Sequence, residues 1–529
     1  MTSPNAARTD RWRALGERAF DVLVIGGGIT GCGIARAAAL RGFTVALVEK
    51  GDFASGTSSR SSRLVHGGVR YLEHGHLHLV FESSAERRRL LRLAPHLVRP
   101  LEFTWPVYQG ARIPRWKLGA GLTLYDALAL FRNVGRHHRL SRTAVLEREP
   151  ALSHTGLLGG ATYFDARTND ARLTLANAIS AMEAGAVVLN HVDERELLRD
   201  AGRVTGARVT DTITGDTTSI RASVVVRATG PWASDVRGSK GAHIAVPRTK
   251  IGNRQALTLL SPADGRVFFA LPAGAQAIVG TTDTFTTASP DQVRASNEDI
   301  RYLLAAANRF FPAANLETGD VVSAWAGIRP LIPTTQDTPG SATREHLVST
   351  DAEGVISITG GKLTTYRVMA NDTLEVVAER LGRPLGRDLT RSLHLPGGDF
   401  SSLDDLKDDA DRTTANRPLA VHLVETYGTR WRAVWEDVSD AGGGERLDDG
   451  LPYVTGELRY SIRREMACTL ADLLVRRTHL AFETRDHGVA AAERAALIAA
   501  PLLGWDRAAR SRALDEYARE VERLFAIDP

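Results

Sequence analysis

The sequence predicts an α/β protein with a doubly wound, mostly parallel sheet, a second antiparallel sheet and an α-helical C-terminal domain. Residues 20–48 predict the first sheet, because two apolar runs of strand length flank a glycine-rich turn and a helix of small residues. Short strand signals between about residues 241 and 340 predict the second sheet. Beyond about residue 396 such signals are few, which indicates a mainly helical region. A chain of 529 residues is long enough for two or three domains with a large core.

The first strand–helix–strand unit is clearly marked. Residues 20–25 form a buried apolar run, and residues 29–40 carry the small and apolar side chains of a helix packed on a sheet. Arg41-Gly42 ends that helix, and residues 44–48 form a second apolar strand. Parallel strands joined in this way imply a sheet that is covered on both faces.

Later elements extend this pattern. Residues 170–186 predict an amphipathic helix, and a short strand over residues 186–190 follows it. A polar β-ribbon leads to a buried strand that begins at Ser223. Residues 355–372 then read as a strand, a glycine turn and a helix.

The composition excludes several classes of protein. Apolar residues make up 43% of the chain and charged residues 24%, as in an ordinary water-soluble protein. The formal net charge is only +4 and no basic tail is present, so we expect no nucleic-acid partner. Cys32 and Cys468 belong to no CxxC or Cys/His cluster, so we expect no metal site and a reduced, cytoplasmic chain.

Neither a secretory signal nor a membrane span is expected. Residues 1–20 lack an apolar core, and no apolar run approaches the roughly 18 residues that a span requires. Any contact with a membrane is therefore expected to be peripheral.

The glycine-rich turn predicts a dinucleotide site. Gly26, Gly28 and Gly31 have the GxGxxG spacing between a strand and a helix. The first glycine allows a tight turn, the second lets a pyrophosphate approach the backbone, and the third lets the helix pack on the strand. The N–H groups of the helix N-terminus then face the phosphate charge. Glu49 ends the second strand, where a carboxylate can accept hydrogen bonds from a ribose.

The wider arrangement favours FAD over NAD. Ala228, Thr229 and Gly230 end a later strand of the same sheet, after the β-ribbon. A dinucleotide domain that is interrupted by other elements suits a long, tightly held FAD better than an exchangeable NAD.

A set of motifs resembles the FAD-dependent glycerol-3-phosphate dehydrogenases of the aerobic, respiratory type. The motifs are, in order, IGGGITG, TSSRSSRLVHGGVRYLE, ATGPW, GTTD, GIRPL, TREH and GGKLTTYR. They span roughly residues 20–367, and ELRYSIRREMACTLADLLVRRT resembles the family's C-terminal region. HGGVRYLE and GGKLTTYR are the most specific of them.

The resemblance implies a Rossmann-like FAD-binding domain, an antiparallel substrate-binding sheet and a helical C-terminal domain. The reaction would be the oxidation of sn-glycerol 3-phosphate to dihydroxyacetone phosphate, in glycerol and glycerophospholipid catabolism. A hydride would pass to flavin N5, and the electrons would pass on to a membrane quinone.

The expected division of the chain follows from these elements. We expect an N-terminal extension over 1–19, an FAD-dependent oxidoreductase core over 20–395 and a helical domain over 396–529. The FAD-binding segments are about 20–110, 160–240 and 350–395, and the substrate-domain segments about 111–159 and 241–349.

Three stretches are expected to hold the cofactor. The hydroxyls after the glycine loop can bond its pyrophosphate and ribityl chain, and adjacent glycines let the backbone approach the flavin ring. Besides the glycine loop and Glu49, the expected residues are Thr57, Ser58, Ser59, Ser62, Gly67, Gly68, Ala228, Thr229, Gly230, Gly361, Lys362 and Leu363.

The reaction also needs a proton acceptor, and histidine is the usual one near pH 7. His66 and His243 are the two candidates. The position that matches His243 lies in the family's substrate pocket, so we favour His243 slightly. Either histidine could instead be structural.

The substrate's phosphate needs fixed positive charge, which arginine supplies through its planar fork. Arg70, Arg329, Arg344 and Lys362 match family positions around the substrate, and Tyr71 would line the same space. Arg329 and Lys362 are also expected to assist catalysis, Lys362 beside flavin N1–C2=O, where negative charge gathers on reduction. Each cation could instead belong to a surface ion pair.

Residues 114–139 predict an amphipathic helix with basic edges. Leu118, Leu122, Tyr125, Leu128 and Leu130-Phe131 would face an anionic lipid surface. The alternative is a helix that packs on the substrate domain. If the first reading holds, the protein lies in the cytoplasm at the inner face of the plasma membrane; a homodimer is left open.

Three other functions compete with the dehydrogenase. A glycerol-3-phosphate oxidase would use the same fold and pass electrons to O2, making H2O2. A D-amino-acid or glycine oxidase would need one carboxylate-binding arginine and no phosphate cluster. A non-catalytic module would hold FAD for structure or redox sensing.

Overall fold

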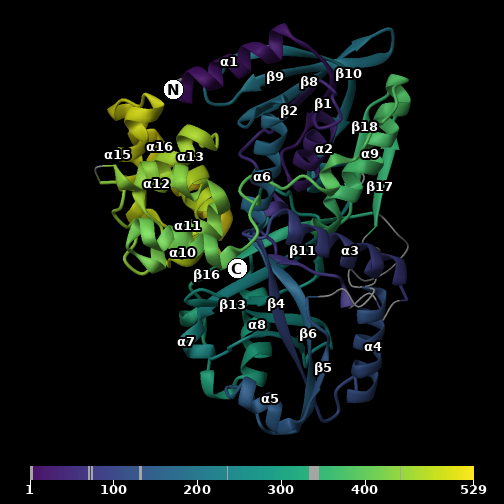
Figure 1. Ribbon diagram of the computed structural model, residues 1–529, viewed down its shortest axis with the longest axis vertical. Coiled ribbons are helices and arrows are strands. Elements are labelled where there is room, and N and C mark those ends of the chain that lie inside the picture. Colours follow the sequence, from purple (N-terminus) through teal and green to yellow (C-terminus); the bar gives the residue numbers. More distant parts are fainter. Residues whose placement is uncertain are drawn as a thin grey trace.

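We describe a computed structural model of the chain (Figure 1). The described residues are 4–69, 72, 75–129, 134–234, 236–332, 345–440 and 442–529. Two sheets lie one above the other in Figure 1, and the C-terminal helices pack against their side.

The first sheet is built on the parallel strands that the sequence predicted. Its order is β17-β18-β10-β1-β2-β7, and β18, β10, β1, β2 and β7 run parallel while the edge strand β17 is antiparallel. The strands are β1 (Ala19–Ile25), β2 (Val45–Val48), β7 (Val187–Leu189), β10 (Thr217–Arg227), β17 (His346–Thr350) and β18 (Ile356–Gly360). The doubly wound α/β fold class is thereby confirmed.

Different elements cover the two faces of this sheet. One face carries the helices α2 (Ile29–Ala39), α6 (Asp170–Glu183) and α9 (Tyr366–Leu381), whose buried side chains share one apolar cluster with β1 and β2. The other face carries β8 (Val192–Asp200) and β9 (Arg203–Asp211), which pair with the first half of β10 to form the predicted ribbon.

The N-terminal helix α1 (Pro4–Glu17) lies across the ribbon side of the first sheet and reaches the C-terminal helices (Figure 1). Arg8 donates to the backbone oxygen of Asn190 at 3.0 Å and to Asp211 at 2.9 Å, while Asn5 donates to the backbone oxygen of Leu503 at 3.1 Å. The predicted extension therefore joins two parts of the molecule.

The second sheet is mostly antiparallel and forms the lower half of Figure 1. Its order is β15-β11-β14-β13-β12-β4-β6-β3, with β16 beside β11 and β5 beside β6. The strands are β3 (Leu64–Val65), β4 (Val98–Tyr108), β5 (His138–Leu140), β6 (Leu157–Thr168), β11 (Arg237–Pro247), β12 (Ala256–Leu260), β13 (Val267–Ala273), β14 (Gln276–Gly280), β15 (Thr284–Phe285) and β16 (Ser323–Leu331). Its accompanying helices are α3 (Leu77–Leu93), α4 (Arg115–Leu128), α5 (Arg142–Arg148), α7 (Arg248–Ile251) and α8 (Asn297–Phe310).

Helix α4 corrects one prediction. Leu118, Leu122 and Tyr125, expected on a lipid-facing stripe, are buried in an apolar cluster with residues of β4 and β6. The apolar face of α4 packs against the second sheet. Burial there removes these side chains from water, so no lipid or second protein is needed to cover them. Trp116 and Leu124 are instead the exposed apolar residues of α4, at 72% and 42% exposure. Leu130 and Phe131 lie outside the described residues.

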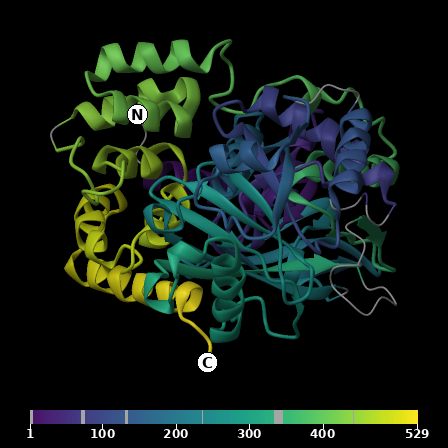
Figure 2. The ribbon, with the colours of Figure 1, turned by 90° about the horizontal axis from the view of Figure 1, so that it is seen from below.

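The C-terminal region is helical, as predicted. Its α-helices are α10 (Leu403–Thr414), α11 (Arg417–Tyr427), α12 (Trp431–Ser439), α13 (Thr455–Arg464), α14 (Leu480–Glu483), α15 (Val489–Leu503) and α16 (Arg507–Phe525), and a π-helical turn covers Asp472–Arg477. Tyr460, Ile462, Met466, Leu470, Leu473 and Leu474, which have core-like spacing in the sequence, are all buried. Figure 2 shows these helices along one side of both sheets.

Within the described residues, every helix is too short or too polar to cross a lipid bilayer.

Candidate active site

A cavity of about 460 Å³ is lined by residues of both sheets and contains most of the site residues that the sequence predicted. Its walls come from the end of β1, the loop after β2, the strands β11 and β16, and the turn after β18. The carboxyl ends of β1, β2, β10 and β18 meet there because these strands run parallel.

The glycine loop lies between β1 and α2, as predicted. Gly26 has φ +112°, a conformation that favours glycine, and a Cβ atom there would lie 2.6 Å from the backbone oxygen of Ala228. A Cβ atom on Gly31 would lie 1.8 Å from the backbone oxygen of Gly26, so helix and strand touch only because this residue has no side chain. Gly28 lines the cavity and precedes the first residue of α2. The helix N-terminus therefore faces the cavity and suits a phosphate.

Glu49 holds the loop from the neighbouring strand. Its two carboxylate oxygens accept the backbone N–H groups of Gly27 at 2.6 Å and of Gly51 at 2.8 Å. Burial raises the pKa of Glu49, and these two hydrogen bonds act in the opposite direction. Each oxygen keeps a lone pair, so the carboxylate can also accept a ribose hydroxyl.

The hydroxyl segment 57–62 contributes unevenly to the cavity. Ser58 lines it and accepts the N–H of Ile29 at 3.0 Å, at the start of α2. Thr57 lines it too, but its hydroxyl donates to the backbone oxygen of Ile328 at 2.6 Å. Ser59 is buried and is absent from the cavity wall.

Ser62 has a role that the sequence did not indicate. Its hydroxyl lies 2.8 Å from Nε2 of His243, so it orients a candidate proton acceptor. It remains part of the cavity wall and can still contact a cofactor.

Two glycine turns close the cavity. Gly68, with φ +79°, lines it, whereas Gly67 lies just behind, where a Cβ atom would come 2.1 Å from the hydroxyl of Tyr125. Gly361, with φ +79°, Lys362 and Leu363 form the second turn and line the cavity. Ala228, Thr229 and Gly230 line it from the end of β10.

His243 is the better placed of the two candidate histidines. It lies on β11, lines the cavity and is 2% exposed, and its ring stacks on Trp325 at 5.4 Å and 12°. Burial lowers its pKa to about 3, and the positive charges of Arg329 and Arg63 add to this effect. The ring is therefore neutral near pH 7 and able to accept a proton. His66 also lines the cavity, and its backbone oxygen accepts the hydroxyl of Thr364 at 3.2 Å.

Arg329 and Lys362 both reach the cavity. Arg329 is held on β16 by Asp283 at 3.2 Å and by the hydroxyl of Thr281 at 3.1 Å. Lys362 donates to Ser83 of α3 at 3.0 Å. Both residues line the same cavity as His243, so positive charge lies in one chamber with a neutral base. Arg70, Tyr71 and Arg344 lie outside the described residues.

Several wall residues were missed by the sequence analysis. Trp105, Tyr163, Asp165 and Phe269 reach the cavity from strands of the second sheet. Asp165 accepts the N–H of Gly67 and the hydroxyl of Tyr125, both at 2.8 Å, and contacts Arg87. The available signal for Asp165 was that it is the one acidic residue of β6.

The other end of the cavity was also missed. Lys50 and Trp232 line it there, with the Lys50 ammonium 4.2 Å from the centre of the Trp232 ring. The signal was present in the sequence, since Lys50 directly follows Glu49 and Trp232 ends the ATGPW motif.

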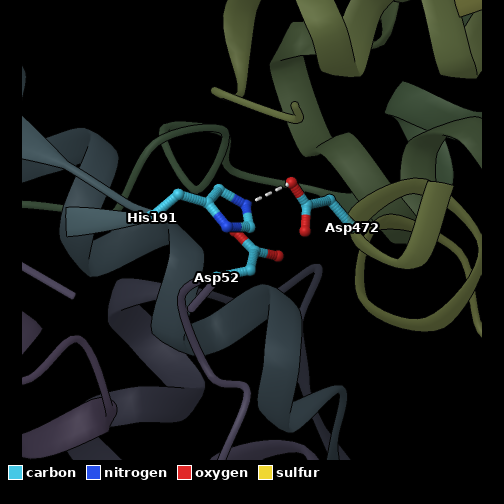
Figure 3. Close-up of side chains that lie close together, drawn as sticks. All are labelled: Asp52, His191 and Asp472. Carbon is cyan, nitrogen blue, oxygen red and sulfur yellow. Dashed lines mark hydrogen bonds and ion pairs between the residues drawn. The ribbon is translucent and has the colours of Figure 1, made fainter. Parts of the chain in front are cut away.

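One cluster of potential metal ligands occurs in the part of the chain that the structure describes (Figure 3). It comprises Asp52, His191 and Asp472, which lie between the first sheet and the C-terminal helices. Asp52 is bonded by Arg477 at 2.6 Å and Arg476 at 2.7 Å, and Asp472 by Arg476 at 2.8 Å and His191 at 2.9 Å. The two arginines already balance both carboxylates, so the cluster is an ion-pair network between domains.

These residues fit FAD. Gly28 lies on the cavity wall without a side chain, directly before α2, and so leaves room for a pyrophosphate to approach the backbone. The cavity reaches from Lys50 and Glu49, beside a ribose position, to Lys362 after β18 and to His243 on β11 of the second sheet. One cavity thus offers an acid for the ribose, a helix N-terminus for phosphate and a chamber for a reacting ring.

Comparisons with known proteins agree with this geometry. A family model described as "FAD dependent oxidoreductase" matches residues 21–367, and one described as "C-terminal domain of alpha-glycerophosphate oxidase" matches residues 389–510. The chain is 37% identical to Glycerol-3-phosphate dehydrogenase 2 of Mycobacterium tuberculosis, over 98% of this chain and 90% of that protein. It is 35% identical to Aerobic glycerol-3-phosphate dehydrogenase of Staphylococcus saprophyticus, over 97% and 95%.

A solved structure is similar over nearly the whole length. The glycerol-3-phosphate dehydrogenase from Bacillus halodurans, solved in complex with FAD, superposes with a TM-score of 0.82 at 32% identity. The match covers 99% of this chain and 98% of that one.

Proposed function

This chain belongs to the FAD-dependent glycerol-3-phosphate dehydrogenase family, and we propose that it oxidises sn-glycerol 3-phosphate to dihydroxyacetone phosphate. The observation that carries the proposal is that a neutral His243 lines the same cavity as the cations Arg329 and Lys362. A neutral base and fixed positive charge are what a phosphorylated secondary alcohol requires.

In this proposal His243 takes up a proton as the substrate's C2 hydroxyl loses one. We assign the proton to Nε2, because this nitrogen faces Ser62, itself a residue of the cavity wall. Because the Ser62 hydroxyl donates to the single lone pair of Nε2, the substrate gives its proton to Ser62 Oγ as Ser62 passes its own proton to Nε2. His66 is the alternative acceptor, since it lines the same cavity.

Arg329 binds the substrate's phosphate. Asp283 and Thr281 hold its guanidinium in place, so little side-chain freedom is lost when the phosphate arrives. Lys362, fixed by Ser83, supplies a second positive charge in the turn next to the flavin position. Arg70, Arg344 and Tyr71 are proposed to complete this pocket on the grounds of the motifs alone.

FAD, when bound, supplies the acceptor for the hydride that leaves C2. The predicted cofactor residues that line the cavity, from Gly26 to Leu363, hold it and exclude water from the chamber. We propose the same division as the sequence predicts, in which FAD-binding and substrate-domain segments alternate over residues 20–395.

We further propose that electrons pass to a membrane quinone and that the protein docks peripherally on an anionic lipid surface at the inner face of the plasma membrane. Four exposed apolar side chains support the docking, namely Leu77 and Phe81 of α3 and Trp116 and Leu124 of α4. Arg115 and Lys117 flank Trp116 and are exposed, so cations accompany the apolar tip.

Anaerobic rapid mixing of the purified flavoprotein with glycerol 3-phosphate tests the reaction. We expect glycerol 3-phosphate to bleach the flavin of the wild type. His243→Gln should slow bleaching by roughly 10²-fold or more. Arg329→Met should raise the substrate concentration that gives the half-maximal rate of bleaching by roughly 10-fold or more. Arg208→Met, an exposed arginine on β9, serves as control. A flavin that stays oxidised with glycerol 3-phosphate but is bleached by glycine would contradict the proposal.

The acceptor is tested on the same preparation. A soluble quinone analogue should reoxidise the protein in preference to O2, with little peroxide formed. Stoichiometric peroxide would instead identify a glycerol-3-phosphate oxidase.

A further inference from the structure

Phe482, in the C-terminal domain, packs directly behind the cavity wall that carries His243. Its ring meets Trp325 edge-on, with centres 5.2 Å apart and planes at 86°. Trp325 in turn stacks face to face on His243. Phe482 and Trp325 are each 2% exposed, so a continuous aromatic contact runs from α14 to the active site.

The orientation of Trp325 depends on this packing. Strand pairing places Trp325 opposite His243, because β16 and β11 are in register at these residues. Pairing fixes the backbone, but the indole Nε1 is buried without a hydrogen-bond partner among the described residues. Contacts with neighbouring rings therefore set the plane of the indole. Because the indole stacks on the imidazole of His243, they also set the plane of the imidazole.

Arg63, directly before β3, contacts the rings of both Phe482 and Trp325. The centre of its guanidinium lies 5.1 Å from the Phe482 ring and 5.7 Å from the Trp325 ring. Such cation–ring contacts are favourable when they are removed from water. Residue 63 has φ +56°, and the packing around it holds this uncommon conformation.

The C-terminal domain holds Phe482 firmly. Phe525 of α16 packs against its other side at 5.0 Å, and Gln276 of β14 donates to the backbone oxygen of Glu483 at 2.7 Å. Helix α14 is thus anchored both to its own domain and to the second sheet.

We propose that Phe482 is a positioning residue for the reaction: by packing on Trp325 it fixes the His243 ring in the orientation that accepts the substrate's proton. The C-terminal domain is then part of the catalytic machinery through one side chain. This inference rests on the proposed function, because it takes His243 as the proton acceptor.

Phe482→Leu tests the inference, with Phe311→Leu as its matched control. Both residues are buried phenylalanines, but Phe311 packs in a separate apolar cluster of the second sheet, whereas Phe482 contacts Trp325. We expect Phe482→Leu to slow anaerobic flavin reduction at saturating glycerol 3-phosphate by roughly tenfold, since small misplacements of a reacting group are costly. Phe311→Leu should leave the rate within about twofold. FAD content and melting temperature are measured for both variants.

The same change in a His243→Gln background shows whether Phe482 acts through His243. If it does, Phe482→Leu causes no further slowing there. Equal slowing in both backgrounds, or no slowing in the wild type, would overturn the inference. If Phe482→Leu loses FAD, Phe482→Met provides the same comparison with a side chain that adapts to the space.

Failure of the proposed function is recognised separately, without any Phe482 variant. It shows as a wild type that glycerol 3-phosphate does not bleach, or as a His243→Gln enzyme that is reduced as fast as the wild type. The latter result would overturn both the assignment of His243 and the inference.

Discussion

Gly280 and His243 face each other across two paired strands, and the histidine requires the glycine. A Cβ atom at position 280 would lie 2.3 Å from Cδ2 of His243. With Trp325 stacked on the ring and Ser62 at Nε2, the imidazole has little freedom left. At the scale of single residues, the active site is therefore organised around one closely surrounded side chain.

The same enclosure predicts how the reaction depends on pH. Burial, Arg329 and Arg63 lower the pKa of His243 to about 3, so the ring loses its ability to accept a proton only when the pH falls toward that value. We expect the ratio of wild-type to His243→Gln rates of flavin reduction, measured at low substrate concentration, to stay constant from about pH 6 to pH 9.

The ionisation of the substrate's phosphate affects the rates of both enzymes equally, so its effect cancels in this ratio. A ratio that falls between about pH 7 and pH 6 would show that the acceptor titrates like an ordinary histidine. That result would mean that His243 itself titrates at about pH 6.5 and that its enclosure does not lower its pKa.

At the scale of elements, α4 shows how one apolar pattern can be misread. Its periodic leucines predicted a lipid-facing stripe, yet Leu118 and Leu122 are buried against the second sheet. Tyr125, on the same inner face, bonds the carboxylate that holds Gly67. An amphipathic helix has one apolar face, and sequence alone does not say whether protein or lipid covers it.

The exposed apolar residues of α4 give the lipid proposal a direct test. The double variant Trp116→Glu/Leu124→Glu should lose most of its flotation with anionic vesicles, because it removes the apolar tip and adds negative charge. Leu497→Glu, which changes a 58% exposed leucine on α15, should float as the wild type does.

Flotation of the double variant at the wild-type level would remove α4 from the membrane contact. Leu122→Glu is not a useful variant here, because Leu122 is fully buried and the change would damage the core.

At the scale of the whole molecule, buried ion pairs hold the C-terminal domain to the first sheet. Arg172 bonds Glu465 through two contacts of 2.6 Å, and the network of Asp52, His191 and Asp472 lies close by (Figure 3). Burial alone would raise the pKa of Asp472, but His191, Arg476 and Arg477 hold it well below its usual range.

This network predicts sensitivity to acid. A carboxyl whose folded pKa is depressed stabilises the fold above its unfolded pKa of about 3.9, and this stability is lost as the pH falls further. At neutral pH we expect Asp472→Asn to lower the melting temperature, since breaking a buried pair costs about 3–5 kcal/mol. The difference in melting temperature between Asp472→Asn and the wild type should become smaller below about pH 4.

Asp515→Asn, which changes an exposed carboxylate of α16, should follow the wild type at every pH. If Asp472→Asn lowers the melting temperature by the same amount at about pH 3.5 and at pH 7, then loss of the Asp472 charge is not the cause of its destabilisation.

Elements that depend on interactions between residues close in sequence could be predicted from the sequence alone. The βαβ unit, the GxGxxG loop and Glu49 were predictable, because hydrophobic period and backbone sterics act over a few residues. The family motifs added FAD and the fold class, and the comparisons confirm both. The helical C-terminal region was predictable for the same reason.

Which distant side chains meet could be seen only in the folded molecule. Ser62 proved to contact His243, residues that are 181 positions apart, and Ser59 proved to lie outside the cavity. The contact of Phe482 with Trp325 joins two domains, and the inner face of α4 was settled by the sheet beneath it. Such contacts depend on how whole layers pack, and packing is a property of surfaces that the chain brings together only on folding.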